Sequence, residues 1–182
     1  MDITDDRIEH LAEFLPSLNS LTDRQNAKAV AEVWYKALEM SPWKDFDEAK
    51  FKEGMDDVTL ISHVNSTVES ALAISRIIKK HHNIDFDEQL IMTFGLLHDV
   101  DKVVEYVYNS DGELVVSDIG KKIQHGVLTA MLARDAGFGI DMQHMIITHT
   151  PTQNKKPLFK EAILFGYVDL CDWELTVKFS KC

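Results

Sequence analysis

The sequence is poor in cysteine, and this scarcity limits what the chain can be. Cys171 and Cys182 are its two cysteines among 182 residues, and no Cys-x-x-Cys motif is present. A disulfide framework and a zinc site built from cysteines are therefore excluded. We expect both cysteines to be free thiols.

Strings of basic residues are also lacking. No run of Lys or Arg is longer than two residues, and the formal net charge is −11 at pH 7. A protein that binds a nucleic acid polymer needs a basic surface that displaces counterions from the phosphates. We therefore expect no nucleic acid partner.

Long hydrophobic stretches and flexible linkers are absent as well. Residues 1–6 (MDITDD) lack the basic start and apolar segment of a signal peptide. No apolar run approaches the roughly 18 residues of a membrane span, so we expect a cytoplasmic protein with no membrane contact. No linker rich in Gly, Pro or Ser and no internal repeat divides the 182 residues, a length that fits one structural unit.

What the sequence does contain is a succession of amphipathic helical patterns, so the predicted fold class is an all-α bundle. Thr4 and Thr22 are expected to cap the first two helices, and the pattern after Ser117 is expected to form a helix that carries His125. Residues 1–57 are predicted to form a helical extension packed on the core of a main domain, residues 58–182. Its Trp34, Tyr35 and Trp43 would either form a lid over a site or pack on the core.

Residues 103–116 interrupt the helical pattern. Two runs rich in β-branched and aromatic residues, 103–108 and 113–116, flank a turn that contains Gly112. This arrangement predicts a short β-hairpin or a loop insertion.

Polar side chains gather at the end of one apolar run. Residues 90–97 are almost entirely apolar and are followed by His98-Asp99-Val100-Asp101-Lys102. Buried polar groups are costly unless they are paired or bind a metal, so this cluster predicts a site. A satisfied core histidine beside solvated acids would explain a His-Asp pair that stands alone. This pair is accompanied along the chain by His63, His125, His149 and Asp169.

These six residues and their local sequences resemble the HD-domain superfamily of metal-dependent phosphohydrolases. The matching stretches are residues 61–64 (ISHV), residues 96–102 (LLHDVDK) and His125-Gly126 before an apolar helix. The resemblance covers roughly residues 58–175. A His-Asp dipeptide by itself is a weak signal, whereas four helices that supply ligands in this order are a strong one. The resemblance implies an HD-domain helical bundle.

The resemblance also implies a binuclear metal site. His63, His98, Asp99 and Asp169 match the residues that hold one metal in the simpler HD enzymes. His125 and His149 match the extra histidines of a subgroup that binds a second metal, with Asp99 placed to bridge. Taken singly, each of these two histidines is equally well explained as a core or surface residue.

The expected cofactor is therefore two divalent metal ions. Imidazole and carboxylate ligands suit several of them, and the identity stays open among iron, manganese, zinc and magnesium. Four further histidines do not match the pattern and are not expected to bind metal: His10, His81, His82 and His144.

The favoured function is phosphomonoester or phosphodiester hydrolysis by a metal-activated water. Asp99 and Lys102 are the predicted catalytic residues. Lys102 resembles the lysine that follows the His-Asp pair in many such hydrolases and would hold phosphate charge. A lysine at a helix end, without function, is the alternative explanation.

A second function fits the same ligands. The six residues also resemble those of the di-iron HD oxygenases, which cleave a small polar substrate with dioxygen. The ligand set does not separate the two reactions. Lys102 favours hydrolysis slightly, but the oxygenases of this group also carry lysines that hold the substrate. A non-enzymatic binding or sensory module is a third reading, disfavoured because nothing else is attached to the domain.

The predicted substrate is a small anionic or phosphorylated molecule. Thr150, Gln153 and Lys155 belong to a polar, basic loop directly after His149, and together with Lys102 they are the predicted substrate-binding residues. A solvated loop is the alternative explanation. The sequence leaves the substrate's identity and the oligomeric state open.

Overall fold

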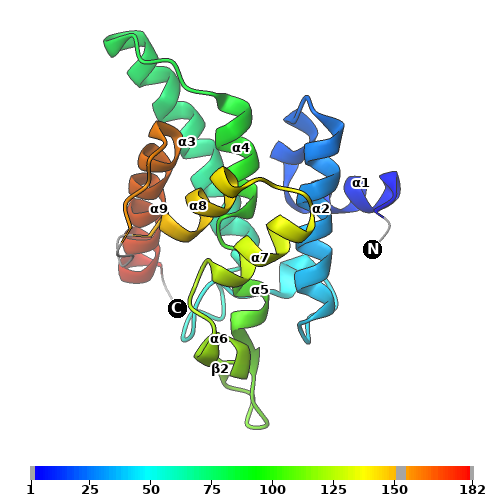
Figure 1. Ribbon diagram of the computed structural model, residues 1–182. Helices are drawn as coiled ribbons and strands as arrows, with labels where there is room; N and C mark the ends of the chain where they lie inside the picture. Colours follow the sequence, from blue (N-terminus) through cyan, green and yellow to red (C-terminus); the bar gives the residue numbers. More distant parts are fainter. Residues whose placement is uncertain (1–2, 151–154, 181–182) are drawn as a thin grey trace.

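The centre of the fold is α4 (Glu88–Leu97), in which every residue from Ile91 to Leu97 is buried. A helix that is hydrophobic on all sides must be enclosed by other elements. The helices that pack around it are α2 (Arg24–Glu39), α3 (Leu60–His82), α8 (Ile140–Thr148) and α9 (Lys160–Phe179) (Figure 1). The computed structural model describes residues 3–150 and 155–180, and it confirms the predicted all-α bundle.

Helices α3 and α9 lie side by side against α4, and Gly95 lets them approach it closely. A Cβ atom at Gly95 would lie 2.5 Å from the Phe165 ring on α9 and 2.7 Å from a Val68 methyl group on α3. Both separations are far below van der Waals contact, so no larger residue fits without a shift. This close packing brings the end of α4 next to both neighbouring helices.

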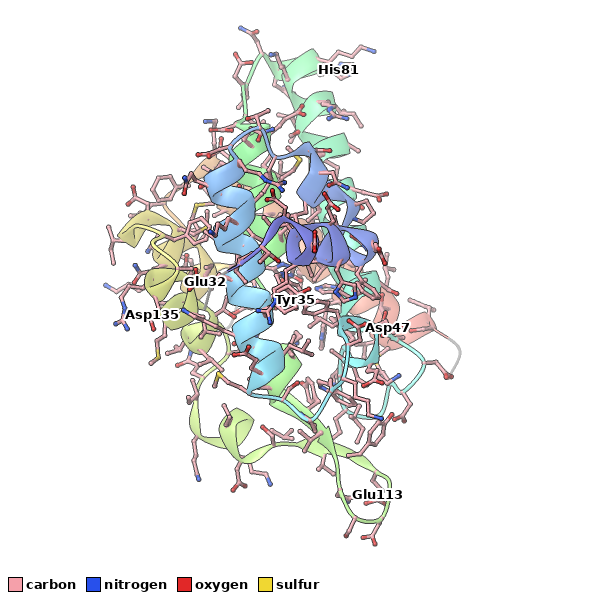
Figure 2. All side chains as sticks on the ribbon, turned by 90° about the vertical axis from the view of Figure 1, so that its right-hand side faces the viewer. Glu32, Tyr35, Asp47, His81, Glu113 and Asp135 are labelled. Atoms are coloured by element: carbon pink, nitrogen blue, oxygen red, sulfur yellow. The ribbon has the colours of Figure 1, made fainter. Side chains whose placement is uncertain are left out.

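The N-terminal helices α1 (Asp5–Phe14) and α2 cover another side of the bundle, and the outer side of α2 faces the viewer in Figure 2. Trp34 is fully buried, and its indole Nε1 donates a hydrogen bond to the carbonyl oxygen of Leu96 at 2.7 Å. Trp43 Nε1 likewise donates to the carbonyl oxygen of Val103 at 2.9 Å. These indoles therefore pack on the core. The domain division at residue 57 stays a prediction.

Of the two predicted helix caps, one is present in the structure and the other is not. Thr4 caps α1 as predicted, because its side chain accepts from the Arg7 N–H. The prediction for Thr22 is wrong. Asp23 caps α2 by accepting from Gln25 N–H, and the Thr22 hydroxyl and N–H both donate to Gln89.

The predicted hairpin is present. Strand β1 (Tyr106–Tyr108) pairs antiparallel with β2 (Leu114–Val116), with Tyr106 opposite Val116. The hairpin extends from the body of the bundle, and Glu113 marks its outer part in Figure 2. The residues just before it, in the short helix α5 (Lys102–Glu105), continue the helical path instead of a strand.

His125 does not lie within a helix, so that prediction is wrong. It lies between α6 (Asp118–Lys122) and α7 (Val127–Asp135). Ile123 is extended, and Gly126 has φ +81°, a left-handed conformation that glycine adopts without strain. The helical path therefore breaks on both sides of His125.

Two short 3₁₀ helices, η1 (Pro16–Ser20) and η2 (Phe46–Glu48), complete the described elements. After η2, the bridge between Lys50 and Thr59 closes a loop that holds Phe51, which is fully buried. Over residues 3–150 and 155–180, none of the helices combines the length and hydrophobicity needed to cross a membrane.

Candidate metal centre

Two groups of side chains that could hold a metal ion lie side by side in the core and share one residue, Asp99. His63, His98, Asp99 and Asp169 form the first group, and Asp99, His125 and His149 form the second. Within each group the candidate ligand atoms lie within 4.8 Å of one another. The structure therefore brings together all six residues predicted as metal ligands.

The first group is built from α3, the end of α4 and α9. His63 Nε2 lies 3.2 Å from Asp99 Oδ2 and 3.1 Å from Asp169 Oδ1. His98 Nε2 lies 3.6 Å and 3.8 Å from the same two oxygens. The four residues are almost completely buried. Two imidazole nitrogens and two carboxylate oxygens thus point at one small volume.

The second group uses the other oxygen of Asp99. His125 Nε2 lies 2.9 Å from Asp99 Oδ1, and His149 Nε2 lies 3.5 Å from it. Asp99 Oδ2 faces the first group and Asp99 Oδ1 faces the second, so this carboxylate stands between them. A carboxylate can bind one cation through each oxygen, and Asp99 is placed to do so.

The carbonyl oxygens beside two of the rings indicate which ring nitrogen is left to bind a cation. Nδ1 of His98 faces the Gly95 carbonyl oxygen at 2.7 Å, and Nδ1 of His149 faces the Ile146 carbonyl oxygen at 2.6 Å. A ring nitrogen that faces a carbonyl must carry the hydrogen, so in the neutral ring Nε2 keeps its lone pair. This assignment follows from the acceptors, since hydrogens are inferred from such contacts.

In each group the Nε2 atoms of the two rings also lie close to each other. The Nε2 atoms of His63 and His98 lie 3.3 Å apart, and so do those of His125 and His149. Two facing lone pairs repel unless a proton or a metal ion lies between them. The donor set of neutral imidazole and carboxylate is the one that suits divalent transition metals, so the residues fit such an ion in both groups.

Burial and neighbouring carboxylates shift the histidine pKa values in opposite directions. Burial lowers the pKa of His98 to about 4. Burial acts in the same sense on His63, but hydrogen bonds with Asp169, Asp172 and Asp99 outweigh it and raise its pKa to about 10. In the absence of a metal, a proton on the His63 ring thus supplies positive charge among the carboxylates.

Asp99 is held ionised by the charges around it. Burial alone would raise its pKa, but nearby positive charges, Lys102 first among them, hold the pKa of this carboxyl well below its usual range. A buried carboxylate of this kind attracts a cation strongly, because little solvent screens it.

A comparison with protein families decides what kind of domain this is. The model of the HD domain family matches residues 46–174, which is more than half of the chain. The chain belongs to the HD domain family. HD domains form a superfamily of metal-dependent phosphohydrolases, and they bind divalent metals. Comparisons with curated proteins and with solved structures gave no match.

The structure of this HD domain adds contacts that sequence reasoning missed. Asp172 Oδ2 lies 2.7 Å from His63 Nδ1, and Asp101 Oδ1 lies 3.2 Å from His125 Nδ1. Asp172 follows Asp169 by one helical turn, a spacing that was visible in the sequence.

Phe51 makes a third contact that sequence reasoning missed. Its ring centroid lies 4.3 Å from that of His63. Phe51 precedes the region of the HD resemblance, which begins near residue 58, but it lies inside the family match. An apolar ring carries no chemical signal of a site.

Lys102 lies beside the metal centre. Its side chain is 11% exposed, and its Nζ atom is 3.9 Å from Asp99 Oδ2. The same ammonium group lies 5.2 Å from the centroid of the Phe51 ring. Burial lowers and the charge of Asp99 raises the pKa of Lys102, and the net shift is upward, so the group stays charged.

Two of the other three predicted substrate residues line a cavity next to His149. Thr150, which is half-buried, and Lys155, which is exposed, line a cavity of about 270 Å³ between the end of α8 and α9. His149 and Tyr167 line the same cavity. Gln153 lies outside the described residues.

The histidines outside the predicted pattern have other surroundings. His10 Nδ1 lies 2.9 Å from the Tyr35 hydroxyl, and His144 Nε2 accepts from the Leu158 N–H at 3.2 Å. His81 and His82 are exposed at the end of α3, and Figure 2 shows His81 at one extremity of the molecule.

Proposed function

We propose that this HD domain hydrolyses a phosphoester of a small molecule at a pair of divalent metal ions. His63, His98, Asp99 and Asp169 would hold one ion, and Asp99, His125 and His149 the other. Ions at these positions supply Lewis acidity, which polarises phosphoryl oxygens and lowers the pKa of water. Hydrolysis with two ions is supported by the two oxygens of Asp99, each of which faces its own set of imidazoles.

The position of Lys102 carries the choice of hydrolysis. Its ammonium group is held within 3.9 Å of Asp99 Oδ2, in surroundings that include the Phe51 ring. An ammonium donates up to three hydrogen bonds and accepts none. In this position Lys102 would donate to phosphoryl oxygens and neutralise charge that develops on them.

The charges around the centre explain why a single lysine matters. Five carboxylates lie in or directly beside the two groups: Asp99, Asp101, Glu105, Asp169 and Asp172. Two divalent ions and Lys102 would together only balance them. The overall charge of −11 repels anions at long range. A phosphate would therefore be attracted only at short range, by the ions and by Lys102.

Thr150 and Lys155 are proposed to contact the rest of the substrate. They line the cavity beside His149, whose lining also includes Lys156 and the ring of Tyr167. Lysines next to an aromatic ring suit an anionic molecule with a flat apolar part. Lys155→Ala should raise KM with little change in kcat, because this contact is remote from the reacting bond.

The decisive assay is hydrolysis under strict anoxia. Phosphomonoesters, cyclic phosphates and nucleotides would be offered to the protein with manganese, magnesium or ferrous iron. We expect phosphate or an opened ester to appear without oxygen. The Asp99→Ala variant, purified in the same way, is the control for a contaminating phosphatase and should be inactive. Turnover that requires dioxygen and iron would replace this proposal with the oxygenase reaction.

A further inference from the structure

Each of the four histidines in the two groups uses its second ring nitrogen, Nδ1, in one of two ways. His98 and His149 follow directly after α4 and α8, and their Nδ1 atoms face carbonyl oxygens of the last helical turn. The carbonyls of a last turn lack partners within the helix, so they are available as acceptors. The helix end itself therefore orients these two rings.

His63 and His125 do not follow a helix end, and their Nδ1 atoms face carboxylates. His63 Nδ1 lies 2.7 Å from Asp172 Oδ2, and His125 Nδ1 lies 3.2 Å from Asp101 Oδ1. Each candidate metal group thus contains one ring held by a backbone carbonyl and one ring that faces a carboxylate.

We propose that Asp172 and Asp101 are positioning residues, each of which controls one metal of the pair through a single histidine. Asp172 acts through His63 on the first group, and Asp101 acts through His125 on the second. A carboxylate that accepts from Nδ1 fixes the tautomer and makes Nε2 a stronger ligand, which is usually worth 10- to 100-fold in metal affinity. This inference rests on the proposed binuclear site.

Asp172 is itself held in place. Its second oxygen, Oδ1, accepts a hydrogen bond from Ser66 Oγ at 2.5 Å. His63 and Ser66 are one turn apart on α3, and Asp169 and Asp172 are one turn apart on α9. One face of α9 therefore carries a metal ligand together with the residue that orients the facing ligand.

Asp101 is anchored in a different way. Its Oδ2 accepts from the Gly126 N–H at 2.5 Å, and its own N–H donates to Thr129 Oγ1 at 2.8 Å. Its Oδ1 and Nδ1 of His125 are buried and lack an aligned hydrogen bond within the part of the chain that the structure describes. At 3.2 Å the attraction between them is mainly electrostatic. This attraction raises the pKa of His125, against the effect of burial.

The test is a metal titration of variants, followed by calorimetry and by elemental analysis. Wild-type protein should bind two ions. Asp172→Asn keeps an oxygen that can accept from His63 and loses the charge, so we expect about a tenfold loss of affinity at one site. Asp172→Ala loses both, and we expect a loss of up to about 100-fold. Asp101→Asn should weaken only the other site.

A second background assigns each effect to a site. In the His125→Ala/His149→Ala protein one ion should remain, held by the first group. In this background, Asp172→Asn should lower the affinity for the remaining ion about tenfold, and Asp101→Asn should leave that affinity unchanged. The matched control is Glu174→Gln, which removes an exposed carboxylate from the same helix as Asp172. The melting temperature of each metal-free variant separates a loss of ligand strength from a loss of fold.

The outcomes separate this inference from the proposed function. Wild-type protein that binds fewer than two ions would overturn the binuclear site. If the wild type binds two ions and Asp172→Asn binds both with unchanged affinity, the positioning role is refuted while the binuclear site stands. Equal weakening of both sites by Asp172→Asn would also refute the division between the two carboxylates.

Discussion

Replacing Lys102 with methionine should affect catalysis and metal binding in opposite directions. The substitution keeps most of the length and volume of the side chain and removes its charge. Lys102 Nζ lies 3.9 Å from Asp99 Oδ2, so the same ammonium group that would attract phosphate also competes with a metal ion for Asp99. We therefore expect slower hydrolysis together with metal affinity that is equal to or higher than that of the wild type.

The magnitudes follow from two interactions. A hydrogen bond between charged groups contributes about 1.5–3 kcal/mol. Its loss in the transition state lowers kcat/KM by about 10- to 150-fold. Two unit charges at 3.9 Å attract by about 4 kcal/mol at an effective dielectric constant of about 20. Removal of Lys102 frees Asp99 from this attraction, which makes the carboxylate more available to a cation.

The assay compares kcat/KM on the phosphoester found in the anoxic screen with metal affinity measured by calorimetry on the same preparation. Lys122→Met is the matched control, because Lys122 is an exposed lysine on α6 and should change neither quantity. Unchanged kcat/KM in Lys102→Met would remove the basis for assigning phosphate binding to this residue. Loss of metal together with activity would show that Lys102 supports the ligands instead of the substrate.

Three further predictions concern the metal ligands. The Asp99→Ala variant should lose most of both ions and all activity, because the two oxygens of Asp99 face the two groups. The Asp101→Ala variant should retain the ion of the first group. Equal metal loss by the two variants in elemental analysis would contradict this distinction. The double variant His125→Ala/His149→Ala should bind about one equivalent of metal, and an unchanged stoichiometry would show that the second site is assigned wrongly. Metal affinity should rise with pH, because the pKa of His63 is raised to about 10 and a metal must displace the His63 proton below that pH. Calorimetry between about pH 6 and pH 9 should show that affinity increases close to tenfold per pH unit for one displaced proton. Affinity that does not change with pH would count against this displacement.

The convergence of the six candidate ligand residues was predictable because they form one joint pattern along the chain, although His125 and His149 are ambiguous when each is taken singly. His98 and Asp99 end a run of apolar residues, and a polar pair in such surroundings needs a partner. The succession of predicted helices and the HD resemblance then identified the remaining four candidate ligands. That these residues bind metal stays a prediction.

Contacts between distant segments were not predictable in the same way. Asp172 is one of 30 acidic residues in the chain, and its spacing of one helical turn from Asp169 does not indicate that it meets His63 on another helix. The break at His125 was missed for a related reason. The apolar pattern continues through residues 119–132, whereas the backbone turns at Gly126. The N–H of Gly126 donates a hydrogen bond to Asp101 Oδ2.

The N-terminal segment illustrates how an apolar residue can matter to a polar site. Phe51 comes from the predicted extension, but its ring contacts that of His63 and lies near the ammonium group of Lys102. Buried apolar surroundings lower the local dielectric constant, which strengthens the attraction between Lys102 and any anion beside it. The loop closed by Lys50 and Thr59 therefore helps to set the strength of the charges at the site, although none of the six candidate metal ligands belongs to it.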